Sequence, residues 1–195
     1  MTLFFIRHGE TVYNREGRVT GQSDIPLGPR GLDQAAGAGR TLRKLLGRRG
    51  IDPASIPFHA SPLERAVRTA QAVRTAMGLE PAPLALDPRL MELSLGAWEG
   101  SLVADIERRE PEVFARRRAD PWTSTAPGGE TYADLAARVG EALGSYPRPC
   151  VLVAHAGTGR AVLHLEADLP RLQASSAPIH QGRVLVVENR AYRWS

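Results

Sequence analysis

The sequence has little sulfur and no long apolar stretch. Its one cysteine, Cys150, excludes an internal disulfide framework and a cysteine-rich zinc site. No apolar run reaches the roughly 18–20 residues that a membrane-spanning helix needs, and the first residues lack the basic leader of a secretory signal peptide. With 43% hydrophobic and 24% charged residues, the chain can bury an ordinary core. We therefore expect a soluble, cytoplasmic globular protein with no membrane partner.

Lysine is almost absent from the basic residues, and aromatic residues are scarce. Of 25 basic residues only Lys44 is a lysine, the formal net charge is +4, and aromatic residues make up 6% of the chain. A nucleic-acid-binding face usually combines a dense basic stripe with aromatic side chains, whereas these arginines are scattered among Asp and Glu. We expect no nucleic-acid partner. Arginine instead suits small anions, because its planar guanidinium group donates two hydrogen bonds to one phosphate.

Short apolar runs separated by amphipathic stretches predict alternating strands and helices. The expected strands are Leu3–Ile6, Ile56–Ala60, Leu84–Leu86, Val151–Ala154 and Val184–Val187. The expected helices are Gly31–Leu46, Pro62–Met77 and Tyr132–Leu143. This order indicates an α/β protein with a largely parallel sheet and helices on both faces. We expect a single domain over residues 1–195, with a helical and loop insertion at about residues 94–130 over the functional site.

Two histidines follow predicted core strands. His8 comes after the first strand and Arg7, and His155 comes directly after Val151–Ala154. Ligands of open α/β sheets bind beyond the carboxyl ends of the strands, so the two imidazoles are candidates for one shared site. Each could equally be a surface histidine at a strand end. A dinucleotide-binding interpretation of Gly157-Thr158-Gly159 is disfavoured, because Val162 stands where that fingerprint needs a small residue.

A third strand end carries an arginine. Ser61 and Pro62 follow Ile56–Ala60 and predict a helix start, with Ser61 as the N-cap and Pro62 in the first turn. Arg65 then lies about one turn into this helix at the sheet edge, where Arg7 and Arg65 could hold one phosphoryl group from two sides. Taken alone, Arg65 is also compatible with a solvated residue paired with an acid.

Together, these segments resemble the histidine phosphatase superfamily, the phosphoglycerate-mutase-like group. The matching segments, in the family's order, are Arg7-His8-Gly9-Glu10-Thr11, Thr20-Gly21-Gln22, Ser61-Pro62-Leu63-Glu64-Arg65-Ala66, Arg89-Leu90-Met91-Glu92, Pro127-Gly128-Gly129-Glu130-Thr131 and Val153-Ala154-His155. They cover nearly the whole chain. The sequence departs from the family at Ala156-Gly157, where a Gly-Gly pair is usual. The resemblance implies a three-layer α/β/α sandwich with a mostly parallel central sheet.

The resemblance also implies a set of functional residues. It implies a phosphohistidine mechanism in which the catalytic residues are His8, Glu92, Arg7, Arg65 and His155. His8 is the nucleophile, Glu92 the general acid, and the other three donate hydrogen bonds to the phosphoryl oxygens. Substrate or phosphate contacts are implied for Asn14, Gly21, Gln22 and Ala156. No metal and no cofactor is implied, and neither H-E-x-x-H nor the serine-hydrolase motif G-x-S-x-G occurs.

Three functions fit this resemblance. The first is a phosphomonoesterase for a small phosphorylated metabolite, the second a cofactor-dependent phosphoglycerate mutase, and the third a non-catalytic domain that binds a phosphorylated ligand. The short region after Glu92 favours the phosphatase, because family mutases carry a longer insertion there. In the region 94–130, the arginines favour a substrate with a second anionic group or form a solvated helix face; they are Arg108, Arg109 and Arg116–Arg118. Trp98 and Trp122 stack on substrate or belong to the core. The oligomeric state stays open, a homodimer included.

Overall fold

A six-stranded mixed sheet forms the centre of the computed structural model, which describes residues 2–82 and 84–195. Its strands are β1 (Thr2–Arg7), β2 (Phe58–Ala60), β3 (Ala85–Leu86), β4 (Cys150–Ala154), β5 (Leu185–Glu188) and β6 (Ala191–Trp194), in the order β3-β2-β4-β1-β5-β6. The pairs β1–β4, β2–β4 and β2–β3 are parallel, whereas β5 runs antiparallel to both β1 and β6. The α/β prediction is confirmed, and β6 is a strand that the sequence did not predict.

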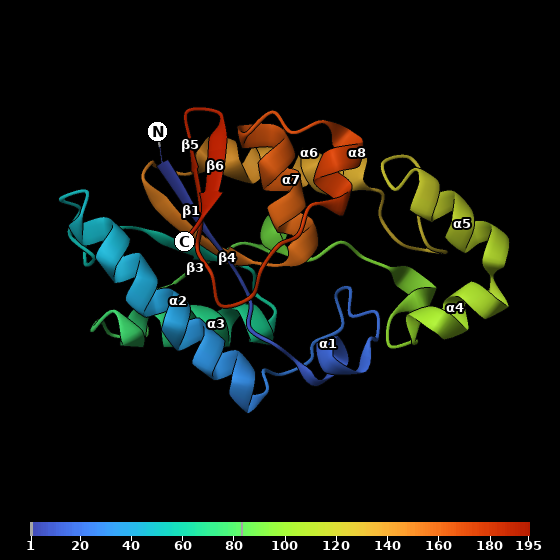
Figure 1. The fold of residues 1–195 in the computed structure, drawn as a ribbon, viewed down its shortest axis with the longest axis horizontal. Helices are drawn as coiled ribbons and strands as arrows, with labels where there is room; N and C mark the ends of the chain where they lie inside the picture. The colour runs from blue at the N-terminus through green and yellow to red at the C-terminus, as the bar shows by residue number, and fades with distance from the viewer. Residues whose placement is uncertain (1, 83) are drawn as a thin grey trace.

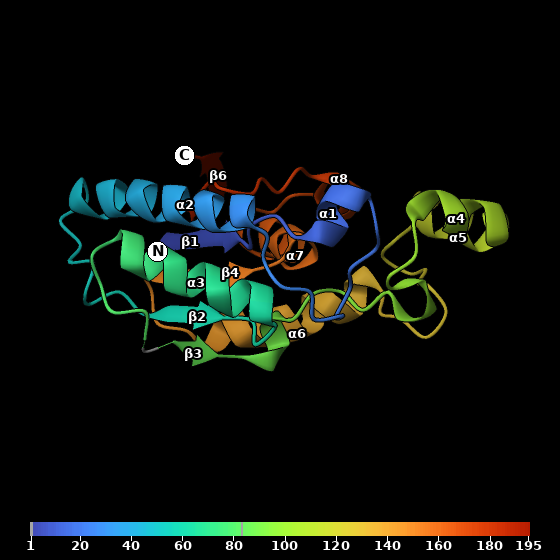
Figure 2. The same ribbon diagram turned by 90° about the horizontal axis from the view of Figure 1, so that it is seen from below.

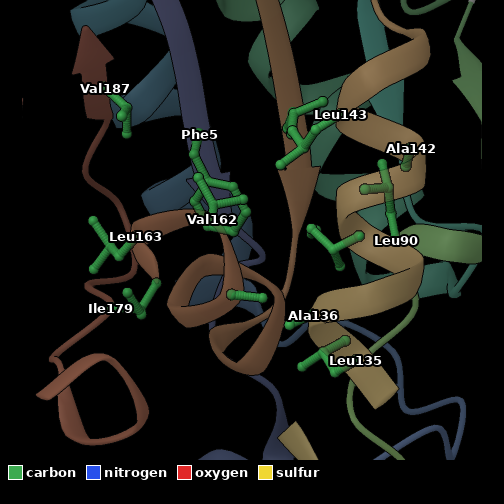
Figure 3. Packing of buried hydrophobic residues seen from close by; sticks show 14 of the residues in the cluster. Phe5, Leu90, Leu135, Ala136, Ala142, Leu143, Val162, Leu163, Ile179 and Val187 are labelled. Atoms are coloured by element: carbon green, nitrogen blue, oxygen red, sulfur yellow. The ribbon is translucent and has the colours of Figure 1, made fainter. Parts of the chain in front are cut away.

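Helices cover both faces of the sheet (Figures 1 and 2). The helices α2 (Pro29–Gly47) and α3 (Glu64–Ala76) lie on one face, and α6 (Tyr132–Ser145) and α7 (Ala156–Glu166) lie on the other. Successive side chains of a strand point to opposite faces: Phe4 packs in the cluster that includes residues of α2 and α3, and Phe5 in the cluster that includes residues of α6 and α7. Figure 3 shows Phe5 in the second cluster beside Val162. The three-layer α/β/α sandwich is therefore confirmed.

Two helix predictions need correction. The helix α3 begins at Glu64 instead of Pro62, and its N-cap position is Leu63, which makes no side-chain capping hydrogen bond. The helix α7 was not predicted, because its first turn contains Gly157 and Gly159 and glycine is a poor helix former. Packing explains Gly159, since a Cβ there would lie 2.8 Å from the Phe5 ring. The predicted helix Gly31–Leu46 lies within α2, and its Leu32 is 40% exposed.

The region 94–130 extends to one side of the sheet (Figures 1 and 2). It holds the short 3-10 helix η2 (Gly96–Trp98) and the helices α4 (Val103–Arg109) and α5 (Pro111–Ala119). Trp98 joins Ile106 and Ala126 in a small separate cluster, and Trp122 is part of the main core, so both tryptophans are core residues. The remaining helices are α1 (Val12–Glu16), α8 (Arg171–Ser176) and the 3-10 helix η1 (Pro88–Leu90). No helix in the described residues is long and apolar enough to span a bilayer.

Candidate active site

Two histidines meet where the neighbouring strands β1 and β4 end. The parallel register places Arg7 opposite Ala154, and the amide N–H of His8 donates to the carbonyl oxygen of Ala154 at 2.8 Å. The residue after each strand is therefore a histidine at the same sheet edge. The ring centroids of His8 and His155 lie 5.2 Å apart, and the side chains are 3% and 0% exposed. The structure thus brings together two residues separated by most of the chain.

The tautomer of His8 follows from its hydrogen bond. Its Nδ1 lies 2.7 Å from the carbonyl oxygen of Gly9, and a carbonyl oxygen only accepts, so Nδ1 carries the proton and Nε2 keeps a lone pair. Burial, together with the charges of Arg65 and Arg7, holds the pKa of His8 well below its ordinary value of 6.5. The imidazole is therefore neutral at neutral pH and presents a nitrogen nucleophile. The position after His8 requires glycine, because a Cβ on residue 9 would overlap the backbone of Gly31.

Two arginines line the cavity beside His8, the buried Arg65 and the partly buried Arg7. The guanidinium group of Arg65 donates to the carbonyl oxygens of Ser23 and Gly21, both at 2.7 Å, and that of Arg7 donates to Ile179 at 2.9 Å. These bonds hold each planar group in one orientation. Burial lowers the pKa of both arginines, and the charge of Glu92 opposes this shift. Arg65 is 0% exposed, so it is not the solvated helix residue that its sequence context also allowed.

Ser61 has a different role from the predicted N-cap. Its Oγ lies 2.7 Å from Nε2 of His155, and its amide N–H donates to the carbonyl oxygen of Val153 at 3.0 Å. The hydroxyl is thus used by a buried imidazole, and α3 starts two residues after Pro62 instead. The Nδ1 of His155 is buried and has no hydrogen-bond partner among residues 2–82 and 84–195. Burial and the nearby charges of Arg65, His8 and Arg7 hold the pKa of His155 well below 6.5.

Glu92 reaches the same cavity from the loop after η1. One carboxylate oxygen accepts from the amide of Leu93 at 2.8 Å, and the other accepts from the amide of Gly157 at 3.2 Å, in the first turn of α7. A Cβ at position 157 would overlap this carboxylate. The departure from the family's Gly-Gly pair therefore falls on Ala156, which lines the cavity, while the glycine that Glu92 requires is kept.

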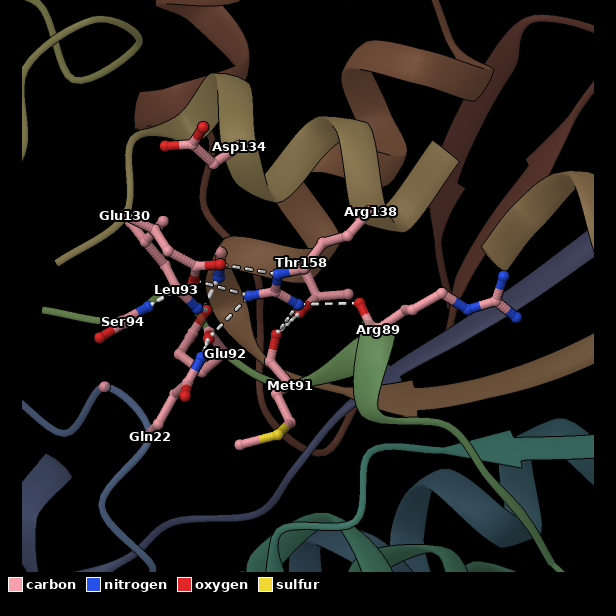
Figure 4. A network of polar contacts seen from close by, with 12 residues as sticks. Gln22, Arg89, Met91, Glu92, Leu93, Ser94, Glu130, Asp134, Arg138 and Thr158 are labelled. Atoms are coloured by element: carbon pink, nitrogen blue, oxygen red, sulfur yellow. Dashed lines mark hydrogen bonds and ion pairs between the residues drawn. The ribbon is translucent and has the colours of Figure 1, made fainter. Parts of the chain in front are cut away.

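Arg138 of α6 holds the loop that carries Glu92 (Figure 4). Its guanidinium group donates to the carbonyl oxygens of Arg89, Met91 and Glu92 at 2.7–3.0 Å and pairs with the carboxylate of Glu130 at 2.9 Å. Gln22 donates to the same Glu92 carbonyl at 3.0 Å. Gln22 thereby supports the backbone of Glu92. It is not among the residues that line the cavity, and its place in the substrate mouth stays a prediction.

A cavity of about 330 Å³ joins these side chains. Among the predicted residues, Arg7, His8, Arg65, Glu92, Asn14, Gly21 and Ala156 line it, and His155 lies buried behind His8. Lining residues that the sequence did not indicate as functional are Arg18, Thr20, Leu93, Leu95, Tyr132, Gly157 and Arg160; of the run Arg116–Arg118, Arg117 also lines this cavity. The sequence would have indicated Arg160 only if α7 had been predicted, because Arg160 lies four residues, about one helical turn, after Ala156 and therefore on the same helix face. Within the described chain, no three His, Cys, Asp or Glu side chains form a metal-binding group.

The sequence and the fold match a known superfamily. A model of the histidine phosphatase superfamily (branch 1) matches residues 3–195, and the chain belongs to this superfamily. The resemblance inferred from the sequence motifs is confirmed.

Solved structures similar to this chain include two phosphatases. The structure of the mycobacterial glucosyl-3-phosphoglycerate phosphatase in complex with VO3 is 30% identical, with a TM-score of 0.77, and the match covers 100% of this chain and 96% of the other. The α-ribazole phosphatase from Shigella flexneri is 25% identical, with a TM-score of 0.79, and the match covers 98% of this chain and 93% of the other.

A curated relative has a mutase name. The probable phosphoglycerate mutase GpmB of Salmonella paratyphi C (strain RKS4594) is 35% identical over 147 residues, which are 74% of this chain. The match spans 62% of the length of that relative.

Proposed function

We propose that this protein is a phosphomonoesterase that hydrolyses a small phosphorylated metabolite through a phosphohistidine on His8. The observation that carries the proposal is the state of His8: a buried, neutral imidazole with Nδ1 bound to the Gly9 carbonyl and Nε2 free, beside the guanidinium groups of Arg7 and Arg65. A neutral imidazole can attack phosphorus, and fixed cations stabilise the charge that spreads over the phosphoryl oxygens in the transition state.

The reaction has two displacement steps. In the first, Nε2 of His8 forms a bond to phosphorus while the ester P–O bond breaks, and the carboxyl group of Glu92 gives its proton to the leaving oxygen. In the second, the Glu92 carboxylate takes a proton from water as the water oxygen attacks phosphorus and the P–N bond breaks. Inorganic phosphate and the starting form of His8 result. Glu92 can reach the leaving oxygen because it lines the same cavity as His8.

His155 acts as a donor in this scheme, with Ser61 setting its tautomer. A phosphoryl oxygen only accepts hydrogen bonds, so Nδ1 of His155 must carry a proton to bind it. Nε2 then has a lone pair and accepts from the Ser61 hydroxyl, which lies 2.7 Å away. Without Ser61 the opposite tautomer would become available, and the buried Nδ1 would present a lone pair to an anion.

Phosphatase activity is favoured over mutase activity by the structures that this chain matches over nearly its whole length. The two phosphatase structures match this chain over 93–96% of their own length. The relative named a probable phosphoglycerate mutase is 35% identical but is matched over 62% of its length. Phosphoryl transfer between positions of a phosphoglycerate is therefore the second candidate. Sugar phosphates, phosphoglycerates, α-ribazole phosphate and phosphoamino acids are the substrate classes to test.

The test combines phosphoenzyme trapping with a substrate panel. Incubation with ³²P-labelled substrates and rapid acid-free quenching is expected to give a base-stable, acid-labile label in the wild type, and none in His8→Ala. The exposed His180 provides the control variant His180→Ala. Free phosphate as the product supports the phosphatase, and an isomerised ester supports the mutase. Normal labelling and turnover in His8→Ala would overturn the mechanism.

Glu92→Gln tests the general acid through its dependence on the leaving group. For an alkyl phosphate the variant is expected to lower kcat by a factor on the order of 10²–10⁴. The loss should be smaller for p-nitrophenyl phosphate, because nitrophenolate leaves without a proton. Equal losses for both substrates would assign Glu92 a structural role. The exposed Glu107 supplies the control variant Glu107→Gln.

A further inference from the structure

The cavity extends away from His8 towards three residues from three helices. Arg117 of α5, Tyr132 of α6 and Arg160 of α7 line the cavity that contains His8. The same three residues line an adjoining cavity of about 430 Å³, which Pro121 and Leu172 also line. They therefore lie where the two spaces meet, between the reacting end of the site and a more apolar outer pocket.

These three side chains offer hydrogen-bond donors. Arg160 donates from Nε to the carbonyl oxygen of Ala177 at 3.0 Å and from Nη1 to the hydroxyl oxygen of Tyr132 at 3.1 Å. The tyrosine oxygen accepts this bond, so its own O–H is available to a further acceptor. The Nε of Arg117 is buried and has no hydrogen-bond partner in the described residues. A group that only accepts hydrogen bonds would complement this surface.

The charges at this position are of one sign. Neither Arg117 nor Arg160 forms an ion pair with any carboxylate in the described part of the chain. Burial lowers the pKa of Arg117, and the charge of Arg160 lowers it further. The charge of Arg160 also acts on Arg7 at the reacting end. Two partly buried guanidinium groups without a counterion are unfavourable, and an anion between them removes that repulsion.

Of the three arginines 116–118 on helix α5, only Arg117 lines the cavity that contains His8. Arg117 is half-buried, whereas the exposed Arg118 lines the adjoining cavity but not this one, and Arg116 is exposed. The run is therefore neither entirely a solvated face nor entirely a binding patch. Arg116 lines neither of the two cavities, so it provides a neighbour of the same residue type on the same helix.

We infer that Arg117, Arg160 and Tyr132 form a second anion subsite, which selects phosphomonoesters that carry another anionic group, a carboxylate or a second phosphate. The inference rests on the proposed function, because it assumes that the first phosphoryl group occupies the His8 end. The substrate class is then a bis-anion with one group at His8 and the other between α5 and α7. Phosphomonoesters without a further anionic group, such as glycerol 3-phosphate, lack this second contact.

Hydrolysis of matched substrates tests the subsite. In the wild type, kcat/KM is expected to be about 10- to 100-fold higher for 3-phosphoglycerate than for glycerol 3-phosphate, the range that charge-assisted hydrogen bonds provide. A comparison of kcat/KM for propane-1,3-diol bisphosphate and its monophosphate tests in the same way whether the subsite accepts a second phosphate. Arg117→Gln should lower the preference for the bis-anion by about tenfold or more, whereas Arg116→Gln should leave it unchanged. A wild-type enzyme with no preference in either pair, or a preference retained in Arg117→Gln, would overturn the inference.

Binding of non-hydrolysable analogues separates the two proposals. Calorimetry compares ω-phosphonocarboxylates of increasing spacer length with alkylphosphonates of the same length. Tighter binding of one or more phosphonocarboxylates, lost in Arg117→Gln and kept in Arg116→Gln, supports the subsite even if no ester is hydrolysed. In that case the proposed hydrolysis fails and the subsite stands. Turnover without any carboxylate preference in binding or kinetics leaves the hydrolysis in place and refutes the subsite.

Discussion

At the scale of single residues, Gly157 decides where a carboxylate can lie. The amide of Gly157 donates to Glu92, and any Cβ at this position would overlap the Glu92 carboxylate. The clashing atoms belong to the end of a flexible side chain, so Glu92 can turn away without a shift of the backbone. The glycine therefore serves the position of Glu92 more than the stability of α7.

Gly157→Ala is expected to lower turnover without lowering stability. The new methyl group displaces Glu92, so we expect kcat to fall by about tenfold or more. Alanine is favoured over glycine within a helix by about 1 kcal/mol, so the melting temperature should not decrease. Steady-state kinetics and thermal unfolding measure the two effects. The neighbouring Ala156→Gly is the comparison: it should destabilise α7 and reduce kcat less. Full activity in Gly157→Ala would refute this role of the glycine.

At the scale of elements, the helix α6 holds the loop between η1 and Glu92. Arg138 donates to three carbonyl oxygens of η1 and this loop through its guanidinium group, which also pairs with Glu130. Thr158 of α7 donates to the carbonyl oxygen of Leu90 at 3.2 Å. Two helices on the same face of the sheet therefore position a residue that belongs to neither.

Arg138→Gln is expected to reduce both stability and turnover. Carbonyl oxygens left without a partner cost about 1–3 kcal/mol, and Glu92 loses its support. As a control, Arg148→Gln removes another partly buried ion pair, that with Glu166 at 2.7 Å, and should affect stability alone. Urea unfolding and kcat measurements separate the effects. If both variants lowered kcat to the same degree at equal stability, Arg138 would have no positioning role. Arg138→Lys retains the positive charge but lacks the planar guanidinium group, so its kcat should lie between those of Arg138→Gln and the wild type.

At the scale of the whole molecule, two neutral buried histidines link stability to pH. The pKa of His8 and of His155 is held well below 6.5 in the folded protein, whereas in the unfolded chain each takes up a proton near about pH 6.5. Below that pH the unfolded state binds more protons than the folded state. Below about pH 6.5 the free energy of unfolding therefore rises with increasing pH, and it decreases as the pH falls.

His8→Gln should flatten the pH dependence of stability. Removal of one such histidine is expected to reduce the slope of the unfolding free energy by up to about 1.4 kcal/mol per pH unit below pH 6.5. Urea unfolding between about pH 5 and pH 7.5 measures this slope. The exposed His180 is the control, because His180→Gln should leave the slope unchanged. Parallel curves for the wild type and His8→Gln would show that His8 titrates normally in the fold.

The C-terminal hairpin shows why part of the sheet escaped prediction. Asn189 and Arg190 connect β5 to β6 with φ values of 52° and 61°, which are typical of a type I′ turn. The usual signal for that turn is Asn-Gly, and arginine in the second position hides it. The strand β6 is mostly exposed, so it also lacks a buried apolar pattern. The pairing with β5 decides the conformation of these residues.

The sequence by itself determined the layers of the fold and the meeting of His8 with His155. Apolar periodicity identifies buried strands, and the carboxyl ends of parallel neighbours lie at one edge. Only the tertiary structure decided which other side chains reach the cavity. Arg117 faces it through the phase of α5, and Arg160 faces it through an unpredicted helix. Such positions depend on packing between segments far apart in the chain, which local residue patterns do not specify.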